Sequence, residues 1–164
     1  MHVTVDSDAP DAPLALLEAD VREEWIDYNG HMSEAYFVLV FGHATDAFLD
    51  RIGMDADHRQ RTGCSLYTVE AHVRYLAEVG RGARLRVTSQ LVAMDDKRVR
   101  LFHRMLDAST NHLVATEELL LLHVDASVPQ TAPFADEIRA QLESIRTAHD
   151  ALGLPTGAGR AITL

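Results

Sequence analysis

The hydrophobic positions in the first third of the chain follow a helical period. Between residues 33 and 52, apolar side chains recur at spacings of three and four, which is typical of one face of a helix. The repeat comprises Tyr36, Phe37, Val40, Phe41, Ala44, Ala47 and Phe48, and Val38 and Leu39 fill most of the remaining circumference. We therefore predict a long helix that needs burial on every side and ends with Gly53 as its C′ residue.

The period changes to two after residue 66, which predicts strands. The strands expected from alternation are 66–76, one beginning at 85, 98–106 and 113–124, and a further strand is expected at 16–25. In 66–76 the odd positions are apolar, so Tyr67 is expected to pack against the helix. Residues 54–64 carry no periodic pattern and are predicted to be irregular, whereas 135–152 has the spacing of an amphipathic helix.

The order of these elements predicts the architecture. One strand, a buried helix, four strands with short connections and a terminal helix contain no βαβ alternation, which argues against a doubly wound parallel sheet. We predict an α+β fold in which an antiparallel sheet of about five strands wraps around one long central helix. Residues 1–13 are expected to be an extended lead-in, 14–128 the main domain, and 129–164 a C-terminal helix and tail that pack on the same domain.

The composition narrows the class of partner. The chain of 164 residues has a formal net charge of −10, whereas nucleic-acid binding needs a basic surface and anionic membranes repel an acidic one. No apolar run reaches the ~18–20 residues of a membrane span, and the single cysteine, Cys64, excludes an intrachain disulfide. We therefore expect a cytoplasmic protein that binds a small molecule and contacts neither nucleic acid nor membrane.

A short polar turn within residues 25–37 leads into the predicted central helix. It places Asp27, Asn29 and His31 around Gly30. Free backbone N–H groups at a helix N-terminus attract negative charge together with the helix dipole, and a glycine lets the backbone approach a ligand closely. The turn therefore suits the stabilisation of an oxyanion. The alternative is that Asp27 and Asn29 serve only as turn and cap residues.

The turn and the order of elements together resemble the hotdog fold. Residues 27–32 look like the segment before the hotdog helix of acyl thioesterases. An Asp there is the catalytic carboxylate of the 4-hydroxybenzoyl-CoA thioesterase group, and plant acyl-carrier-protein thioesterases carry an Asp, an Asn and a His at similar spacing. A wider set of segments resembles the betainyl-CoA thioesterases of carnitine degradation. These segments are 25–37, 65–70, 96–98, 102–103 and 121–125.

The resemblance implies catalytic roles for the residues of the turn. Asp27 is expected to be the general base or the nucleophile, and the sequence does not choose between them. Asn29 is expected to fix the water or the carbonyl, and His31 to hydrogen-bond the thioester, orient Asp27 or shuttle a proton. The oxyanion is expected to bind backbone N–H groups of Gly30, His31 and Met32. No cofactor is implied, because CoA is part of the substrate. No HxxxH or Cys/His cluster predicts a metal.

Aromatic residues around the turn are candidates for binding the acyl group. Trp25, Tyr28 and Tyr36 lie close together in a sequence with few aromatic residues. A quaternary ammonium group, such as that of a betainyl substrate, binds well to an aromatic cage. Core packing is the alternative for Trp25 and Tyr36.

Polar residues further along the chain complete the predicted binding site. Thr68 and Glu70 lie on the polar face of their strand, where Glu70 suits a second carboxylate or a partner for a cationic acyl group. A solvated strand face is the alternative. Lys97 and Arg98 are the predicted contacts of the CoA phosphates, with ordinary surface charge as the alternative.

The predicted activity is hydrolysis of a small acyl-CoA, and the resemblance suggests betainyl-CoA. A hotdog hydratase or dehydratase is one alternative; it needs a pair of a histidine and a carboxylate, which His31 and Glu70 match loosely. A non-catalytic acyl-CoA-binding module is the other. The exposed edge and face of a hotdog sheet predict a homodimer or homotetramer, and the resemblance implies active sites at the interface between protomers.

Overall fold

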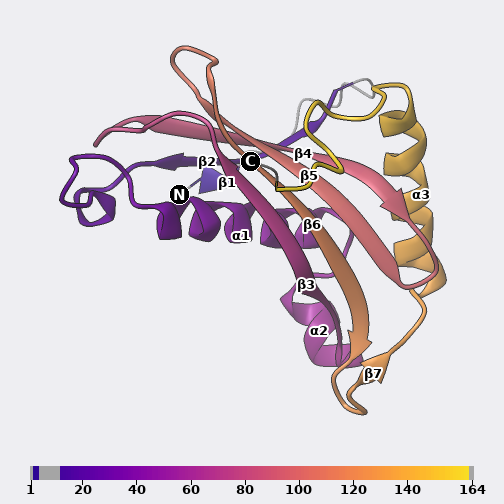
Figure 1. The fold of residues 1–164 in the computed structure, drawn as a ribbon. Coiled ribbons are helices and arrows are strands. Elements are labelled where there is room, and N and C mark those ends of the chain that lie inside the picture. Colours follow the sequence, from indigo (N-terminus) through magenta and orange to yellow (C-terminus); the bar gives the residue numbers. More distant parts are fainter. Residues whose placement is uncertain (1, 4–11, 163–164) are drawn as a thin grey trace.

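A curled antiparallel sheet packs against one long helix (Figure 1). The computed structural model describes residues 2–3 and 12–162. Its elements are β1 (His2–Val3), β2 (Leu14–Asp20), a 3-10 turn (Glu23–Trp25), α1 (Glu34–Arg51), α2 (Ala56–Thr62), β3 (Cys64–Tyr75), β4 (Arg84–Met94), β5 (Arg98–Asp107), β6 (Leu113–Asp125), β7 (Gln130–Thr131) and α3 (Asp136–Asp150). The strand order is β1-β2-β4-β5-β6-β3, with β7 beside β6. The predicted α+β hotdog architecture is confirmed.

Helix α1 lies where the spacing of apolar residues predicts it. Ser33 is its N-cap, Ile52 is its C-cap, and Gly53 follows with φ +85°, a left-handed conformation that favours glycine after a helix. The side chains of Phe41 and Phe48 are completely buried. The helix therefore fills the curl of the sheet (Figure 1).

One stripe of α1 remains exposed, so the prediction that this helix is buried on every side is wrong for the single chain. Val38 and Leu39 are 45% and 43% exposed. The sheet curls around only part of the helix, and β3, at the end of the strand order, pairs among the described residues with β6 alone. An apolar stripe and an unpaired sheet edge therefore lie on the same molecule.

Strand β3 contains a bulge that changes which residues face α1. The register with β6 shifts between Thr68 and Glu70, so two residues that alternation places on one face point to opposite faces. Leu66 and Thr68 line a pocket against α1, as does Ala71 beyond the bulge. Tyr67, which was expected to pack on the helix, is instead 48% exposed.

Two further expectations are corrected by the structure. The first strand ends at Asp20, so Trp25 lies in the 3-10 turn and not in a strand. The segment expected to be irregular contains α2, capped by Asp55, whose side chain accepts the N–H of His58 at 2.8 Å. Only His58 of this helix is buried, so α2 has no apolar stripe from which periodicity can identify it.

Helix α3 packs beside β4 and the C-terminal end of α1. Ile138 and Leu142 belong to the same core cluster as Phe48. The predicted amphipathic helix is therefore confirmed in position, two residues shorter at its C-terminal end. Most of the predicted lead-in, namely residues 1 and 4–11, lies outside the described residues, and β1 pairs antiparallel with β2.

Candidate active site

A tight turn fixes the position of Asp27 ahead of α1. The N–H of Asp27 donates to the carbonyl of His31 at 2.9 Å, and its carbonyl accepts the N–H of Gly30 at 3.0 Å. Gly30 has φ +83°, which a residue with a side chain adopts only with strain. An isolated bridge between Ile26 and Met32 closes the base of the turn. The backbone geometry around Asp27 is thus determined by local hydrogen bonds and one glycine.

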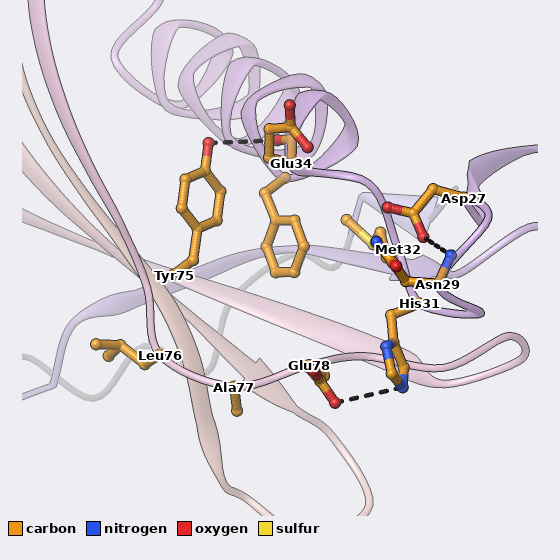
Figure 2. Close-up of a pocket in the computed structure, with 10 residues that line it drawn as sticks. Asp27, Asn29, His31, Met32, Glu34, Tyr75, Leu76, Ala77 and Glu78 are labelled. Carbon is orange, nitrogen blue, oxygen red and sulfur yellow. Dashed lines mark hydrogen bonds and ion pairs between the residues drawn. The ribbon is translucent and has the colours of Figure 1, made fainter.

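The carboxylate of Asp27 has one oxygen held by the turn. Its Oδ1 atom accepts the backbone N–H of Asn29 at 2.8 Å (Figure 2), which is the Asx arrangement expected of a turn residue. No hydrogen bond or ion pair to a described residue involves Oδ2. Asp27 therefore serves as a turn residue and still has one carboxylate oxygen available for chemistry.

The N-terminus of α1 is not capped by a side chain. Ser33 makes no side-chain cap; its own N–H donates to Trp25 and its carbonyl accepts the N–H of Tyr36 at 3.0 Å. The N–H groups of Glu34 and Ala35 have no hydrogen-bond acceptor among the described residues. Two donors in the first turn of α1 are therefore open, where the helix dipole favours negative charge.

The three backbone donors predicted from the sequence differ in availability. The N–H of Gly30 donates within the turn at 3.0 Å, and the N–H of Met32 donates to the carbonyl of Val79 at 2.8 Å. The N–H of His31 has no acceptor among the described residues. His31 is therefore the member of the predicted set that remains open, and the first turn of α1 supplies two more donors.

A pocket of about 510 Å³ lies beside the turn and the N-terminus of α1 (Figure 2). Its lining comprises Asp27, Asn29, His31, Met32, Glu34, Phe37, Tyr75, Leu76, Ala77 and Glu78. The lining contains three carboxylates and no Lys or Arg. The structure thus brings the three predicted catalytic residues to one pocket and makes that pocket acidic.

His31 points toward Glu78 and away from Asp27 (Figure 2). Its Nε2 atom lies 3.3 Å from a carboxylate oxygen of Glu78. Glu78 is not among the residues predicted from the sequence. It lies in the connection between β3 and β4 and reaches the turn because neighbouring Val79 accepts the N–H of Met32. No spacing in the sequence signals this approach.

Tyr75 closes the other side of the pocket. Its hydroxyl donates to the carbonyl of Glu34 at 3.5 Å, and its ring packs edge-on against Phe37 with centroids 5.4 Å apart. Burial raises the pKa of Tyr75, and the negative charges of Glu34 and Glu117 raise that pKa further. Tyr75 is therefore a neutral hydroxyl that links β3 to the first residue of α1.

The three aromatic residues near the turn do not form a cage within one chain. Trp25 and Tyr36 stack on each other with centroids 5.4 Å apart and planes at 16°, and Arg22 covers the Trp25 ring at 5.6 Å. Tyr28 is 97% exposed. The first two rings therefore stabilise the approach to α1, and Tyr28 stands apart from them in solvent.

Thr68 and Glu70 are also separated, because of the bulge in β3. Thr68 lines the pocket against α1, whereas Glu70 lines a different pocket together with Arg100 and Glu118. Arg100 forms an ion pair with Glu118 there. Neither Thr68 nor Glu70 lines the pocket at the turn.

Lys97 and Arg98 lie at the opposite end of β4 from the turn. The connection that leads into β4 is next to the turn, since Val79 accepts the N–H of Met32. The 11 residues of β4 span roughly 35 Å at the rise of a strand. Arg98 is held by Asp95, with 2.6 Å between Nε and Oδ2. Within one chain these two basic residues are therefore remote from Asp27.

A second carboxylate of interest, Glu117, was missed. It lies on β6, is only 5% exposed, and burial raises its pKa to about 7. The signal was present in the sequence: alternation through Leu119 and Leu121 places Glu117 on the inward face of its strand. The run of leucines predicts an apolar strand, and this prediction does not single out the inward carboxylate of Glu117.

The described residues contain no cluster of three or more histidine, cysteine, aspartate or glutamate side chains arranged to hold a metal ion. In the same part of the chain, no helix has both the length and the apolar character required to cross a membrane.

Comparison with known proteins identifies the relatives of this chain. The model of the thioesterase-like superfamily matches residues 21–142. A betainyl-CoA thioesterase of Pseudomonas aeruginosa is 42% identical over 151 residues, which cover 92% of this chain and 95% of that protein. An L-carnitine dehydrogenase/betainyl-CoA thioesterase of Agrobacterium fabrum is 46% identical over 152 residues, which cover 93% of this chain and 31% of that longer protein.

Solved structures share the fold. A crystal structure from Pseudomonas putida KT2440, provisionally assigned as a thioesterase, has a TM-score of 0.81 and 36% identity, with 93% of this chain and 97% of that chain covered. SAV2348 from Staphylococcus aureus, solved in complex with CoA, has a TM-score of 0.85 at 24% identity, with 90% of this chain and 93% of that chain covered.

Proposed function

Because the chain belongs to the thioesterase-like superfamily, we propose that it is an acyl-CoA thioesterase whose substrate is betainyl-CoA, hydrolysed to glycine betaine and CoA in carnitine degradation. The observation that carries the proposal is the half-buried carboxylate of Asp27 in one pocket with the uncapped N-terminus of α1. The betainyl assignment is supported by the relative from Pseudomonas aeruginosa, whose name states that substrate. It is also supported by the acidic lining of the pocket, which suits a cation.

The reaction places the thioester carbonyl between Asp27 and the first turn of α1. Carbonyl oxygen gains negative charge as the carbon becomes tetrahedral, and the open N–H groups of His31, Glu34 and Ala35 are the donors available for it. Prearranged donors of this kind contribute on the order of 10²–10³ in rate each.

Asp27 acts in one of two ways. As a general base, Oδ2 takes a proton from water while the water oxygen bonds to the carbonyl carbon. The intermediate then collapses, the C–S bond breaks, and CoA leaves as a thiolate that takes up the proton held by Oδ2. As a nucleophile, Oδ2 itself bonds to the carbon, CoA leaves, and water hydrolyses the mixed anhydride. Both routes use the oxygen that the turn leaves free, and Asn29 lines the same pocket beside it.

We further propose that two copies associate through the edge of β3. This edge has no strand partner among the described residues, and unpaired strand edges favour pairing with another chain. The exposed stripe of α1 and Val69 of β3, which is 54% exposed, supply apolar surface for the contact. Lys97 and Arg98 of the second copy are the proposed contacts of the CoA phosphates. The proposed assembly is a homodimer or homotetramer, located in the cytoplasm.

The test is turnover by the purified full chain with betainyl-CoA and a panel of other acyl-CoAs. A thioesterase releases free thiol from betainyl-CoA with saturation kinetics. Thiol release only from other acyl-CoAs would contradict the substrate and leave the reaction class standing. A change in enoyl absorbance without free thiol would indicate a hydratase, and CoA binding with neither signal would indicate a binding module.

A further inference from the structure

Glu117 is a buried carboxylate that the proposed chemistry does not use. It lies on β6 opposite Val73 of β3 and opposite His103 of β5. Its side chain is 95% buried, since its exposed fraction is 5%, and it lines a pocket against α1. Burying a carboxylate is costly unless a partner compensates for the lost water.

No partner for this carboxylate is present among the described residues. Glu117 accepts no hydrogen bond and forms no ion pair there. Every side-chain oxygen or nitrogen of the described residues that lacks a hydrogen-bond partner is in contact with solvent. The oxygens of Glu117 therefore open into the pocket. Among the described residues, no group in the pocket offsets the cost of burying the Glu117 carboxylate.

The pocket that Glu117 faces has the composition of a site for an apolar cation. Its volume is about 430 Å³. Its lining comprises Val38, Leu39, Gly42, His43, Thr45, Asp46, Leu49, Leu66, Thr68, Ala71, Glu117 and Leu119. Two carboxylates and aliphatic side chains contribute to it, and no Lys or Arg does.

His103, which lies opposite Glu117, does not neutralise its charge. His103 is bonded through both ring nitrogens, to Thr45 at 3.1 Å and Ser89 at 2.8 Å, and burial lowers its pKa to about 3. His43 and Asp46 lie on α1 and line the pocket, and Tyr75 lies two positions from Val73 along β3. His103 is therefore uncharged at neutral pH, and Asp46 and Tyr75 have no cationic form.

This pocket and the pocket at the turn both lie along the seam between α1 and β3. Phe37 and Tyr75 line the pocket at the turn, and Val38, the next residue of α1, lines the pocket of Glu117. The charge of Glu117 acts on the hydroxyl of Tyr75, so the carboxylate lies within electrostatic reach of the first pocket. The seam between α1 and β3 therefore leads from Asp27 to Glu117.

We propose that Glu117 is the specificity-determining residue that binds the trimethylammonium group of the acyl chain, with Val38, Leu39 and Leu119 contacting its methyl groups. This inference rests on the proposed function. A quaternary ammonium has no N–H to donate, so it is recognised by negative charge and by apolar contact. In a betainyl thioester one methylene separates the nitrogen from the reacting carbonyl carbon, so its binding pocket must adjoin the catalytic one.

The test compares betainyl-CoA with 3,3-dimethylbutanoyl-CoA, in which a neutral carbon replaces the ammonium nitrogen at the same shape. For the full-length wild type, the ratio of kcat/KM for the two substrates is expected to favour betainyl-CoA. In Glu117→Gln this ratio falls by about 10- to 100-fold, because one attractive contact between opposite charges is lost. Glu117→Asp is expected to recover part of it.

The matched control is Glu118→Gln, because Glu118 is the next residue of β6 and pairs with Arg100 on the other face of the sheet. Its substrate ratio is expected to equal that of the wild type. An equal loss on both substrates in Glu117→Gln would overturn the role of Glu117 while leaving the proposed function intact. A wild type that hydrolyses the neutral substrate and not betainyl-CoA would instead overturn the proposed substrate.

The wild type alone provides a second measurement, which does not depend on how well the variant folds. Because burial raises the pKa of Glu117 to about 7, the ratio of kcat/KM for betainyl-CoA to that for the neutral substrate is expected to rise with pH up to about 7 and level off above it. Both substrates contain the same thioester and the same CoA phosphates, so the pH dependence that comes from these groups cancels in the ratio. A ratio that does not change between about pH 5 and 8 would contradict the proposal.

Discussion

The Oδ1 atom of Asp27 accepts the backbone N–H of Asn29 at 2.8 Å. This one contact separates two functions of the same carboxylate. Oδ1 shapes the turn, and Oδ2 is left facing the pocket at the N-terminus of α1. A substitution that retains the acceptor and removes the acid therefore tests the chemistry without changing the turn.

Asp27→Asn is the substitution that meets this condition. Its side-chain oxygen can still accept the N–H of Asn29, whereas an amide is neither a general base nor an effective nucleophile. We expect kcat for thioester hydrolysis to fall by about 10²–10⁴-fold, measured as thiol release at saturating substrate. The thermal midpoint is expected to stay close to that of the wild type, because the turn hydrogen bond is retained.

Asp27→Ala is the companion variant, and it loses the turn contact as well as the acid. Its activity is expected to match that of Asp27→Asn, with an additional loss of about 0.5–1.5 kcal/mol in stability from the missing hydrogen bond. If Asp27→Asn keeps more than a tenth of the wild-type kcat, Asp27 is not the catalytic carboxylate.

The elements that alternate or repeat regularly are the ones that the sequence predicted well. Helix α1 was predicted with its Gly53 C-terminus because the apolar repeat and a glycine with positive φ both act locally. The three catalytic candidates of the turn were found because they are adjacent in sequence and lie in one pocket.

Features that depend on distant pairing were not predictable in this way. The bulge between Thr68 and Glu70 is set by the register with β6, so alternation within β3 alone assigned Tyr67 to the wrong face. Glu78 reaches His31 through a contact between segments that are far apart in the sequence. These relationships arise from tertiary pairing, which local propensity does not encode.

Glu117→Gln is expected to stabilise the protein in a pH-dependent manner. Burial raises the folded-state pKa of Glu117 from 4.5 to about 7. The wild type therefore loses stability as pH rises from 4.5 toward 7, because the unfolded chain releases the proton first. The free energy of unfolding of Glu117→Gln minus that of the wild type should be larger at pH 8 than at about pH 4, by up to about 3 kcal/mol.

Denaturant unfolding at both pH values measures this difference. The Glu118→Gln control is expected to show no comparable dependence, since Glu118 is paired with Arg100 on the other face of the sheet. If the free energy of unfolding of Glu117→Gln differs from that of the wild type by the same amount at both pH values, Glu117 is not a buried, unpaired acid.

His103→Gln is expected to show the opposite dependence on pH. Thr45 donates its hydroxyl proton to Phe41 at 3.1 Å, so it accepts from the Nε2–H of a neutral His103. The folded-state pKa of His103 is lowered from 6.5 to about 3. Its contribution to stability is therefore complete above pH 6.5 and declines as pH falls toward 3.

The substitution should cost about 1–3 kcal/mol at pH 7.5, because two buried hydrogen bonds are lost. This cost should shrink by about 1.4 kcal/mol at pH 5.5, where the unfolded wild type binds a proton that its folded form does not. Unfolding curves for both proteins at the two pH values give the comparison. A cost that grows on acidification would show that His103 is protonated in the folded state.

Leu39→Asp tests the proposed association of two copies. Leu39 lies on the exposed stripe of α1 and is 43% exposed in the single chain, so the substitution has little effect on the fold of one protomer. In an apolar contact between copies, a buried and unpaired carboxylate costs several kcal/mol. The expected result is a particle of half the wild-type mass in sedimentation; the mass is the readout, because Leu39 also lines the pocket of Glu117. Leu154→Asp is the matched control, because Leu154 is 67% exposed after α3, and it should leave both mass and activity unchanged.

A wild type that sediments as a monomer would exclude the proposed contact. A Leu39→Asp variant that keeps the wild-type mass would place the contact elsewhere on the protein.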